Sequence, residues 1–127
     1  MFLIDTSVWI DYFHDGKTAD FVDNLIDNND ICINDIVLAE LIPFVMHRGE
    51  MELEYLLKSV PMLKMDIDWH ELILMQYENL EHGINKVGIS DLIIAQNAMQ
   101  NNIVLFSLDK HFLLMSEILP LQLLKNE

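Results

Sequence analysis

The chain of 127 residues contains a single cysteine, Cys32, and no long uninterrupted apolar segment. One cysteine excludes an intrachain disulfide, which fits a reducing compartment. A membrane-spanning helix needs about 20 consecutive apolar residues, and the sequence has no such run. The first residues also lack the basic region and following apolar region of a secretory signal peptide. We therefore expect a cytoplasmic protein that makes no membrane contact.

Glycine and proline are also scarce, with 4 and 3 residues respectively. No stretch rich in glycine, serine or proline separates one part of the chain from another, and no repeat or low-complexity tract is present. The hydrophobic content of 52% is enough to build a sizeable core. We expect one domain that covers residues 1–127.

Basic residues number only 7, against 21 acidic residues, so the formal net charge is −14. A chain with this charge repels the phosphates of nucleic acids at long range. A solvated acidic surface that keeps the protein soluble explains much of the excess. The remaining question is whether some of the acidic residues converge.

Short apolar runs alternate with amphipathic stretches along the chain, which is typical of an α/β fold with a mostly parallel sheet. Apolar runs without polar alternation indicate strands that are covered on both faces. The expected strands are 2–4, 31–33, 61–65, 103–106 and, at an edge, 121–124. The expected helices are 7–13, 18–28, 34–48, 50–59, 68–82, 90–102 and 110–116. In the helix at 68–82, one side carries Trp69, Leu72, Ile73, Gln76 and Leu80.

Asp5 and Asp109 each follow a predicted buried strand and precede a predicted helix. In open parallel sheets the ligand crevice lies outside the carboxyl ends of the strands, so both carboxylates would border such a crevice. Aspartate is also a common N-cap, and each residue is equally explained as the cap of the helix that follows. The sequence leaves both interpretations open.

Glu40 and Asp91 lie on predicted helices. Glu40 shares a helical stripe with Ile36 and Phe44, and a carboxylate on such an apolar face needs a partner. The alternative is that the helix is rotated and Glu40 reaches water. Asp91 lies in the first turn of its helix, where the helix dipole favours a negative charge without any function.

The hypothesis of a site depends on the coincidence of these four acids. If the strands are parallel neighbours, one crevice receives the carboxylates of Asp5, Glu40, Asp91 and Asp109. Without a cation these groups would repel each other, and some would bind protons. Mg²⁺ and Mn²⁺ prefer hard oxygen ligands of this kind. The sequence therefore indicates a divalent-metal site, and the usual chemistry of such sites is phosphate-ester hydrolysis.

Four segments, FLIDTSVWIDYF, LAEL, ISDLIIAQNA and LFSLDKHF, resemble the successive motifs of PIN-domain ribonucleases. The resemblance is closest to the toxins of VapBC-type toxin–antitoxin pairs, and it extends from the first residues to about Phe112. It implies a three-layer α/β/α fold with a central parallel sheet, a homodimer, and a small antitoxin that occupies the groove. Position by position, it implies that the metal-binding and catalytic residues are Asp5, Glu40, Asp91 and Asp109, bordered by Ser7 and Ser107.

The function implied by the resemblance is that of an endoribonuclease dependent on Mg²⁺ or Mn²⁺. The bound metal would lower the pKa of a water and polarise the phosphodiester, and the hydroxide would attack in line. The products would carry a 5′-phosphate and a 3′-hydroxyl, and no protein nucleophile is needed. The histidines lack the spacing of a metal or catalytic pair and receive no role; they are His14, His47, His70, His82 and His111.

Two features depart from the family pattern. Some members carry a further acid shortly after the fourth one, whereas this chain has Lys110 and His111 there, so four acids are expected and no more. The negative charge also leaves few candidates for phosphate contacts, namely His47, Arg48, Lys86 and Lys110, each of which is also explained as a solvated surface residue. The alternative function is a catalytically lapsed acidic interaction module on the same fold.

Overall fold

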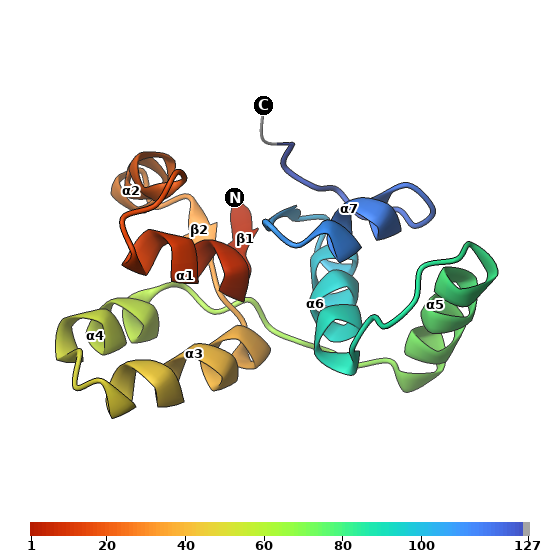
Figure 1. Ribbon diagram of the computed structural model, residues 1–127, viewed down its shortest axis with the longest axis horizontal. Helices are drawn as coiled ribbons and strands as arrows, with labels where there is room; N and C mark the ends of the chain where they lie inside the picture. Colours follow the sequence, from red (N-terminus) through yellow and green to blue (C-terminus); the bar gives the residue numbers. More distant parts are fainter. Residues whose placement is uncertain (126–127) are drawn as a thin grey trace.

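The computed structural model describes residues 1–125 and contains three strands and seven helices in that range. In chain order these are β1 (Phe2–Ile4), α1 (Thr6–Phe13), α2 (Ala19–Asp27), β2 (Ile31–Cys32), α3 (Asp35–His47), α4 (Met51–Ser59), α5 (Trp69–Glu81), α6 (Ile89–Gln100), β3 (Val104–Phe106) and α7 (Lys110–Ser116). The strands lie between a group formed by α1 to α4 and a group formed by α5 to α7 (Figure 1). The predicted α/β/α layering is confirmed.

The sheet has the order β2-β1-β3, and both pairings are parallel. Phe2 pairs with Ile31 on one side and with Val104 on the other, and Ile4 pairs with Phe106. Because all three strands run in one direction, the loops that follow them leave from the same edge of the sheet. Asp5 therefore emerges beside the residues that follow Phe106.

The strands expected at 61–65 and 121–124 are wrong as full strands. Each segment forms a single parallel bridge, Met62 with Ile33 and Leu123 with Leu105, one at either edge of the sheet. On the first edge the pairing ends at once, because Asn34 already caps α3 and the helix begins at Asp35. On the other edge the pairing is limited to the two hydrogen bonds of Leu105 with Gln122 and Leu124.

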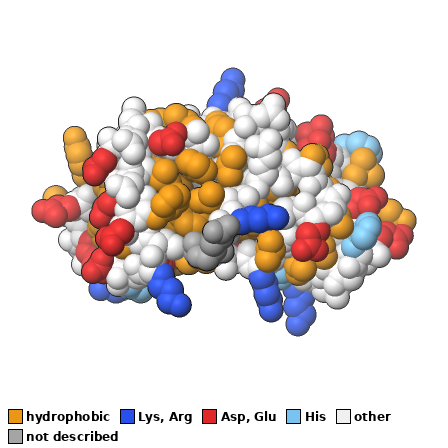
Figure 2. Space-filling view, turned by 90° about the horizontal axis from the view of Figure 1, so that it is seen from above, with side chains coloured by type: hydrophobic (Ala, Val, Ile, Leu, Met, Phe, Trp, Pro, Cys, Tyr) orange, Lys and Arg blue, Asp and Glu red, His pale blue; other side chains and the backbone are white. Residues whose placement is uncertain are grey.

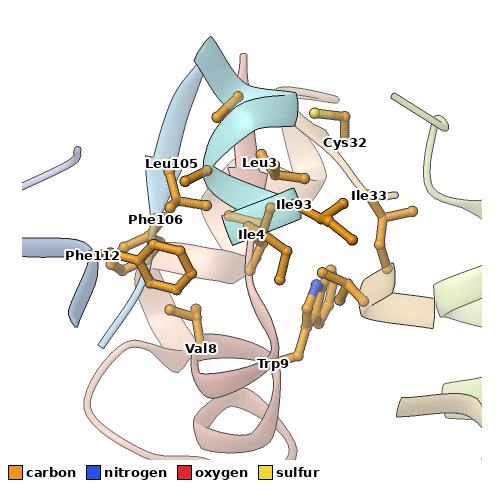
Figure 3. Packing of buried hydrophobic residues seen from close by; sticks show 14 of the residues in the cluster. Leu3, Ile4, Val8, Trp9, Cys32, Ile33, Ile93, Leu105, Phe106 and Phe112 are labelled. Atoms are coloured by element: carbon orange, nitrogen blue, oxygen red, sulfur yellow. The ribbon is translucent and has the colours of Figure 1, made fainter. Parts of the chain in front are cut away.

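The core surrounds α6, which is buried along its whole central part from Leu92 to Ala98. Figure 3 shows Ile93 of this helix packed among the side chains of β1 and β3, including Ile4 and Phe106. Continuous burial explains why the segment ISDLIIAQNA has no amphipathic pattern. The helix that carries Asp91 is thus held rigidly against the sheet.

Two buried asparagines join α3 to α6. The Asn34 side chain donates to Oδ1 of Asn97 at 2.9 Å, and Asn97 donates to the backbone carbonyl of Lys64 at 2.9 Å. The Oδ1 atom of Asn34 accepts the backbone N–H of Val37, which caps α3. This pair sets the position of α3, the helix of Glu40, against α6, the helix of Asp91.

The apolar side of α5 that the sequence indicated is only partly buried. Leu72, Met75 and Asn79 are buried, whereas Trp69, Ile73 and Leu80 are 60%, 66% and 59% exposed. We call the exposed side the α5 apolar face; its residues are Trp69, Ile73, Tyr77 and Leu80, with Ile89 at the start of α6.

No helix within residues 1–125 is long and apolar enough to cross a membrane.

The asparagine pair gives a stability prediction. Asn97→Ala leaves the Asn34 amide and the Lys64 carbonyl without partners, so the free energy of unfolding should fall by about 2–4 kcal/mol. Asn85→Ala, at an exposed position, should change it by less than about 0.5 kcal/mol. Urea unfolding followed by circular dichroism measures both. Equal stabilities for the two variants would contradict a structural role for the pair.

Candidate metal centre

Asp5 caps α1 and is almost completely buried, with 4% of its surface exposed. Its backbone is extended, and its Oδ1 atom accepts the Val8 N–H at 3.4 Å and the Ser7 hydroxyl at 2.6 Å. The second oxygen, Oδ2, accepts the Ser107 hydroxyl at 2.8 Å. The interpretation of Asp5 as an N-cap is therefore correct. It does not exclude the interpretation as a residue of a ligand crevice, because the same carboxylate lies at the carboxyl edge of the sheet.

Two serines connect the loop after β1 to the loop after β3. Ser107 accepts the Asp109 N–H at 2.9 Å, and Ser7 accepts the Leu108 N–H at 2.9 Å. Both hydroxyls donate to Asp5, so the network fixes the carboxylate and both loops at once. Ser7 and Ser107 border the acids, as the resemblance implied.

The pKa of Asp5 is raised to about 6, mainly by burial. The charge of Asp109 contributes to this rise. The hydrogen bonds from Ser7, Ser107 and the Val8 backbone act in the opposite direction and stabilise the charged form. Desolvation is the largest of these effects. A neighbouring cation would remove the disadvantage of the charged form.

Asp91, Asp109 and His111 form the tightest group, with ligand atoms that lie within 4.8 Å of one another. Asp109 caps α7 by accepting the His111 N–H at 2.9 Å, and the His111 ring nitrogen Nδ1 lies 3.7 Å from Oδ1 of Asp109. The sequence reasoning gave His111 no role. The available signal was its place two residues after Asp109, in the first turn of a helix capped by that residue.

The pKa of Asp91 is raised, first by burial and then by the charges of Asp109 and Glu40, while His111 lowers it. Asp109 therefore acts on both Asp5 and Asp91, and Glu40 acts on Asp91. All four predicted acids belong to one electrostatically coupled group. We call Asp5, Glu40, Asp91 and Asp109 the acidic site.

Glu40 lies at the exposed border of this group. Of the two orientations that the sequence left open for Glu40, the structure shows the one in which it reaches water, because α3 turns Val37, Leu41 and Val45 inward and leaves Glu40 exposed. Its Oε1 atom accepts the Thr6 hydroxyl at 2.8 Å, which holds it near the start of α1. Thr6, like His111, was not identified from the sequence as part of this region.

The four residues considered for phosphate contacts occupy different environments. Lys110 directly follows Asp109 in the chain. Arg48 is the C-cap of α3, where its side chain pairs with Glu50 at 3.3 Å and lies 5.4 Å from the centre of the Phe44 ring. His47 is exposed at the same end of α3, and Lys86 is exposed in the loop before α6. Only Lys110 is adjacent to a residue of the acidic site in sequence.

The donor set fits a hard divalent cation. It offers carboxylate oxygens from four residues and one imidazole, and within residues 1–125 no lysine or arginine forms an ion pair with any of the four acids. Oxygen donors of this kind suit Mg²⁺ and Mn²⁺, and a histidine nitrogen suits the softer Mn²⁺ better.

The raised pKa of Asp5 predicts a pH-dependent stability difference. In the folded protein the pKa is about 6 instead of the ordinary 3.8, so the charged form destabilises the fold. This loss is absent below about pH 4 and complete above about pH 6, where it amounts to about 3 kcal/mol. In EDTA, Asp5→Asn should therefore exceed the native chain in stability at pH 8, and the excess should vanish near pH 4. Urea unfolding at each pH tests this, and a difference independent of pH would contradict it.

Comparisons with known proteins fit this geometry. A VapBC2 complex from Rickettsia felis bound to promoter DNA matches with a TM-score of 0.76 and 21% identity over 99% of this chain and 98% of that chain. A DNA-bound VapBC from Salmonella typhimurium matches with a TM-score of 0.72 and 21% identity over 96% and 95% of the two chains. VapBC-1 from nontypeable Haemophilus influenzae matches with a TM-score of 0.68 and 23% identity over 98% of this chain and 96% of that chain.

At these identities the solved structures show a shared fold. A search of curated proteins found no significant match. The PIN domain family, in contrast, matches residues 2–117, which is nearly the whole chain. Over that range lie the parallel sheet, the acidic site and the serines that border it. The chain therefore belongs to the PIN domain family.

Proposed function

We propose that this chain is a divalent-metal-dependent endoribonuclease and the toxin of a VapBC-type toxin–antitoxin pair in the cytoplasm. The observation that carries the proposal is the convergence of four carboxylates at the carboxyl edge of the sheet without any lysine or arginine partner among the described residues. Such an arrangement is unfavourable by itself and becomes favourable when a cation binds. Membership of the PIN domain family supports the same chemistry.

The residues proposed to hold Mg²⁺ or Mn²⁺ are Asp5, Glu40, Asp91 and Asp109. Asp91 and Asp109 have ligand atoms that lie within 4.8 Å of each other and of a ring nitrogen of His111. Asp5 is the most buried of the acids and has both oxygens oriented by serine hydroxyls. Glu40 is exposed and can approach from the rim of the site.

A divalent ion bound there would lower the pKa of a water and polarise the phosphodiester for hydrolysis. The protein contributes positions and charges. The Ser7 and Ser107 hydroxyls hold Asp5 in one orientation, and the caps of α1 and α7 fix the backbones that carry Asp5 and Asp109. The metal-bound water would be the nucleophile, so no side chain is required in that role.

The proposed partner is a small antitoxin protein. Support comes from the similar solved structures, which are described as VapBC complexes from three bacteria. An antitoxin that inserts a basic side chain among the carboxylates would neutralise the same charge as the metal and would block the substrate.

We also propose that the chain forms a homodimer through the α5 apolar face. Two chains of formal charge −14 repel each other, so they can pack only through a face with few acids. The five apolar side chains of this face are each more than half exposed, between 54% and 66%. A contiguous exposed apolar face of this kind is typical of a protein contact.

The alternative, a lapsed interaction module, predicts acids without metal affinity. The structure keeps the features that a working site needs: both capping acids, both serines and the coupled pair Asp91 and Asp109. Stabilisation by Mn²⁺ separates the two proposals, because only an intact site binds the ion more tightly when folded.

The nuclease proposal predicts metal-dependent cleavage of RNA. Purified protein with Mn²⁺ should cut total cellular RNA into discrete fragments, and EDTA should stop the reaction. Asp91→Ala and Asp5→Ala should each reduce the rate by at least about a hundredfold, because each removes a proposed metal ligand. Denaturing gel electrophoresis of the products measures this.

The matched control is Asp66→Ala, which removes one exposed carboxylate outside the acidic site and should leave cleavage unchanged. Thermal unfolding with and without Mn²⁺ provides a second readout: the ion should raise the melting temperature of the native chain and of Asp66→Ala, and raise that of Asp91→Ala much less. A protein that Mn²⁺ neither stabilises nor activates would refute the nuclease and favour the interaction module.

The dimer proposal predicts that one charge on the α5 apolar face separates the protomers. Ile73→Lys should convert the dimer into a monomer in analytical ultracentrifugation, because a buried unpaired lysine is strongly unfavourable. Leu74→Lys is the control, since Leu74 is also about half exposed on α5 but lies outside this face. Dissociation by Leu74→Lys alone, or a monomeric native chain, would disprove this assignment of the interface.

A further inference from the structure

Two adjoining hollows lie beside the acidic site, on the side of α7 and the last described residues. The first has a volume of about 380 Å³, and its lining includes Ser107, Asp109, Lys110 and Lys125. The second, of about 160 Å³, has Lys17, Phe21 and Lys125 in its lining. Leu124 and Lys125 line both hollows, so the two adjoin at these residues, and we call the pair together the lysine groove.

The lysine groove collects positive charge in a strongly negative protein. Three of its lining residues, Lys17, Lys110 and Lys125, are among the only 7 basic residues of the chain. No ion pair is formed by any of the three within residues 1–125, whereas Arg48 and Lys58 pair with Glu50 and Glu54. On the face in Figure 2, lysine or arginine side chains lie at the upper edge, near the centre and along the lower edge, and most acids lie toward the left and right sides.

The groove also contains an aromatic ring in a defined orientation. Phe21 is 42% exposed, and its ring meets that of the buried Phe106 edge to face, with centroids 5.5 Å apart and planes at 89°. The buried ring of β3 thus supports Phe21 from within the protein. An exposed aromatic ring between lysines is the combination that binds single-stranded nucleic acid, because bases stack on the ring and phosphates contact the cations.

One end of the groove reaches the acidic site directly. Asp109 belongs to that site, and Ser107 donates to Asp5 while accepting the Asp109 N–H. A single-stranded nucleic acid that lies in the groove would therefore run from the lysines toward the carboxylates, where one of its phosphodiesters would meet a bound metal ion.

We propose that the lysine groove binds a single-stranded stretch of the RNA substrate, with Lys17, Lys110 and Lys125 contacting phosphates and Phe21 stacking on a base. The inference rests on the proposed nuclease function and adds the place where the substrate is held. It also explains how a protein of charge −14 accommodates RNA: the attraction is confined to one path, and the acids elsewhere stay in solvent.

The test measures binding of a fluorescently labelled single-stranded RNA by anisotropy at several salt concentrations, with EDTA present so that no cleavage follows. The groove variant combines Lys17→Ala, Lys110→Ala and Lys125→Ala. The control variant combines Arg48→Ala, Lys58→Ala and Lys64→Ala. Each variant loses three positive charges, so both have the same net charge and the same long-range repulsion of RNA.

The groove variant should bind RNA at least about tenfold more weakly. The slope of log binding constant against log salt concentration should become less steep by about 2, as expected for three lost phosphate contacts on a single strand. The control variant should change affinity by less than about threefold. Phe21→Ala should weaken binding at least about fivefold without changing the salt slope, because stacking releases no counterions.

Equal weakening by the two triple variants would overturn the proposal, since net charge alone would then govern binding. A salt slope unchanged in the groove variant would overturn it as well. These outcomes are independent of the nuclease proposal, which fails only if Mn²⁺ neither stabilises the native chain nor supports cleavage. Mn²⁺ stabilisation of the groove variant, measured by thermal unfolding, shows that its acidic site is intact.

Discussion

The repulsion among four carboxylates at one edge of a parallel sheet is the interaction on which the rest of the structure depends. Parallel strands bring the ends of β1 and β3 together, and this places Asp109 within range of both Asp5 and Asp91. Burial is the main cause of the raised pKa values at Asp5 and Asp91, and repulsion from the neighbouring carboxylates adds to it. The fold can keep such a cluster because hydrogen bonds within it, and a cation when present, offset the cost of burying charge.

Capping and function are combined in the same residues. Asp5 and Asp109 each accept a backbone N–H at the start of a helix, and this bond fixes the direction of the carboxylate. A cap uses only part of the acceptor capacity of a carboxylate, so the remaining lone pairs stay available to a ligand. The two interpretations that the sequence left open for these residues are therefore compatible, and an N-cap at the carboxyl end of a buried strand is a rigid support for a metal ligand.

The sequence predicted the elements that depend on local pattern and failed where tertiary packing decided. Strands β1, β2 and β3 and all seven helices were found, because apolar runs and capping residues mark them. Which apolar residues of α5 are buried was not predicted: Leu72 and Met75 pack inward while Trp69 and Ile73 remain outside. A stripe of apolar residues shows that a helix has an apolar side, but it does not show whether that side meets the core or another surface.

The candidate site shows the same division. Its four acids could be found because their positions follow from strand ends, helix starts and the family motifs. The choice between the two orientations of Glu40 and the proximity of His111 could not be predicted, because both depend on how α3 and α7 are rotated against their neighbours. The start of α6 shows the same limit: the sequence placed it at residue 90, whereas the helix begins at Ile89 and its N-cap is Gly88.

The net charge of −14 is therefore a poor guide to what this protein can bind. Charge acts on a ligand at close range through the few groups that face it, because salt screens the rest beyond about 8–10 Å. The acids of the site would attract a divalent cation, and a cation bound there would reverse the local field for a phosphate. The lysines of the neighbouring groove extend that favourable field along one path. A strongly acidic protein can thus bind a polyanion, provided that its few positive groups lie together and beside the metal.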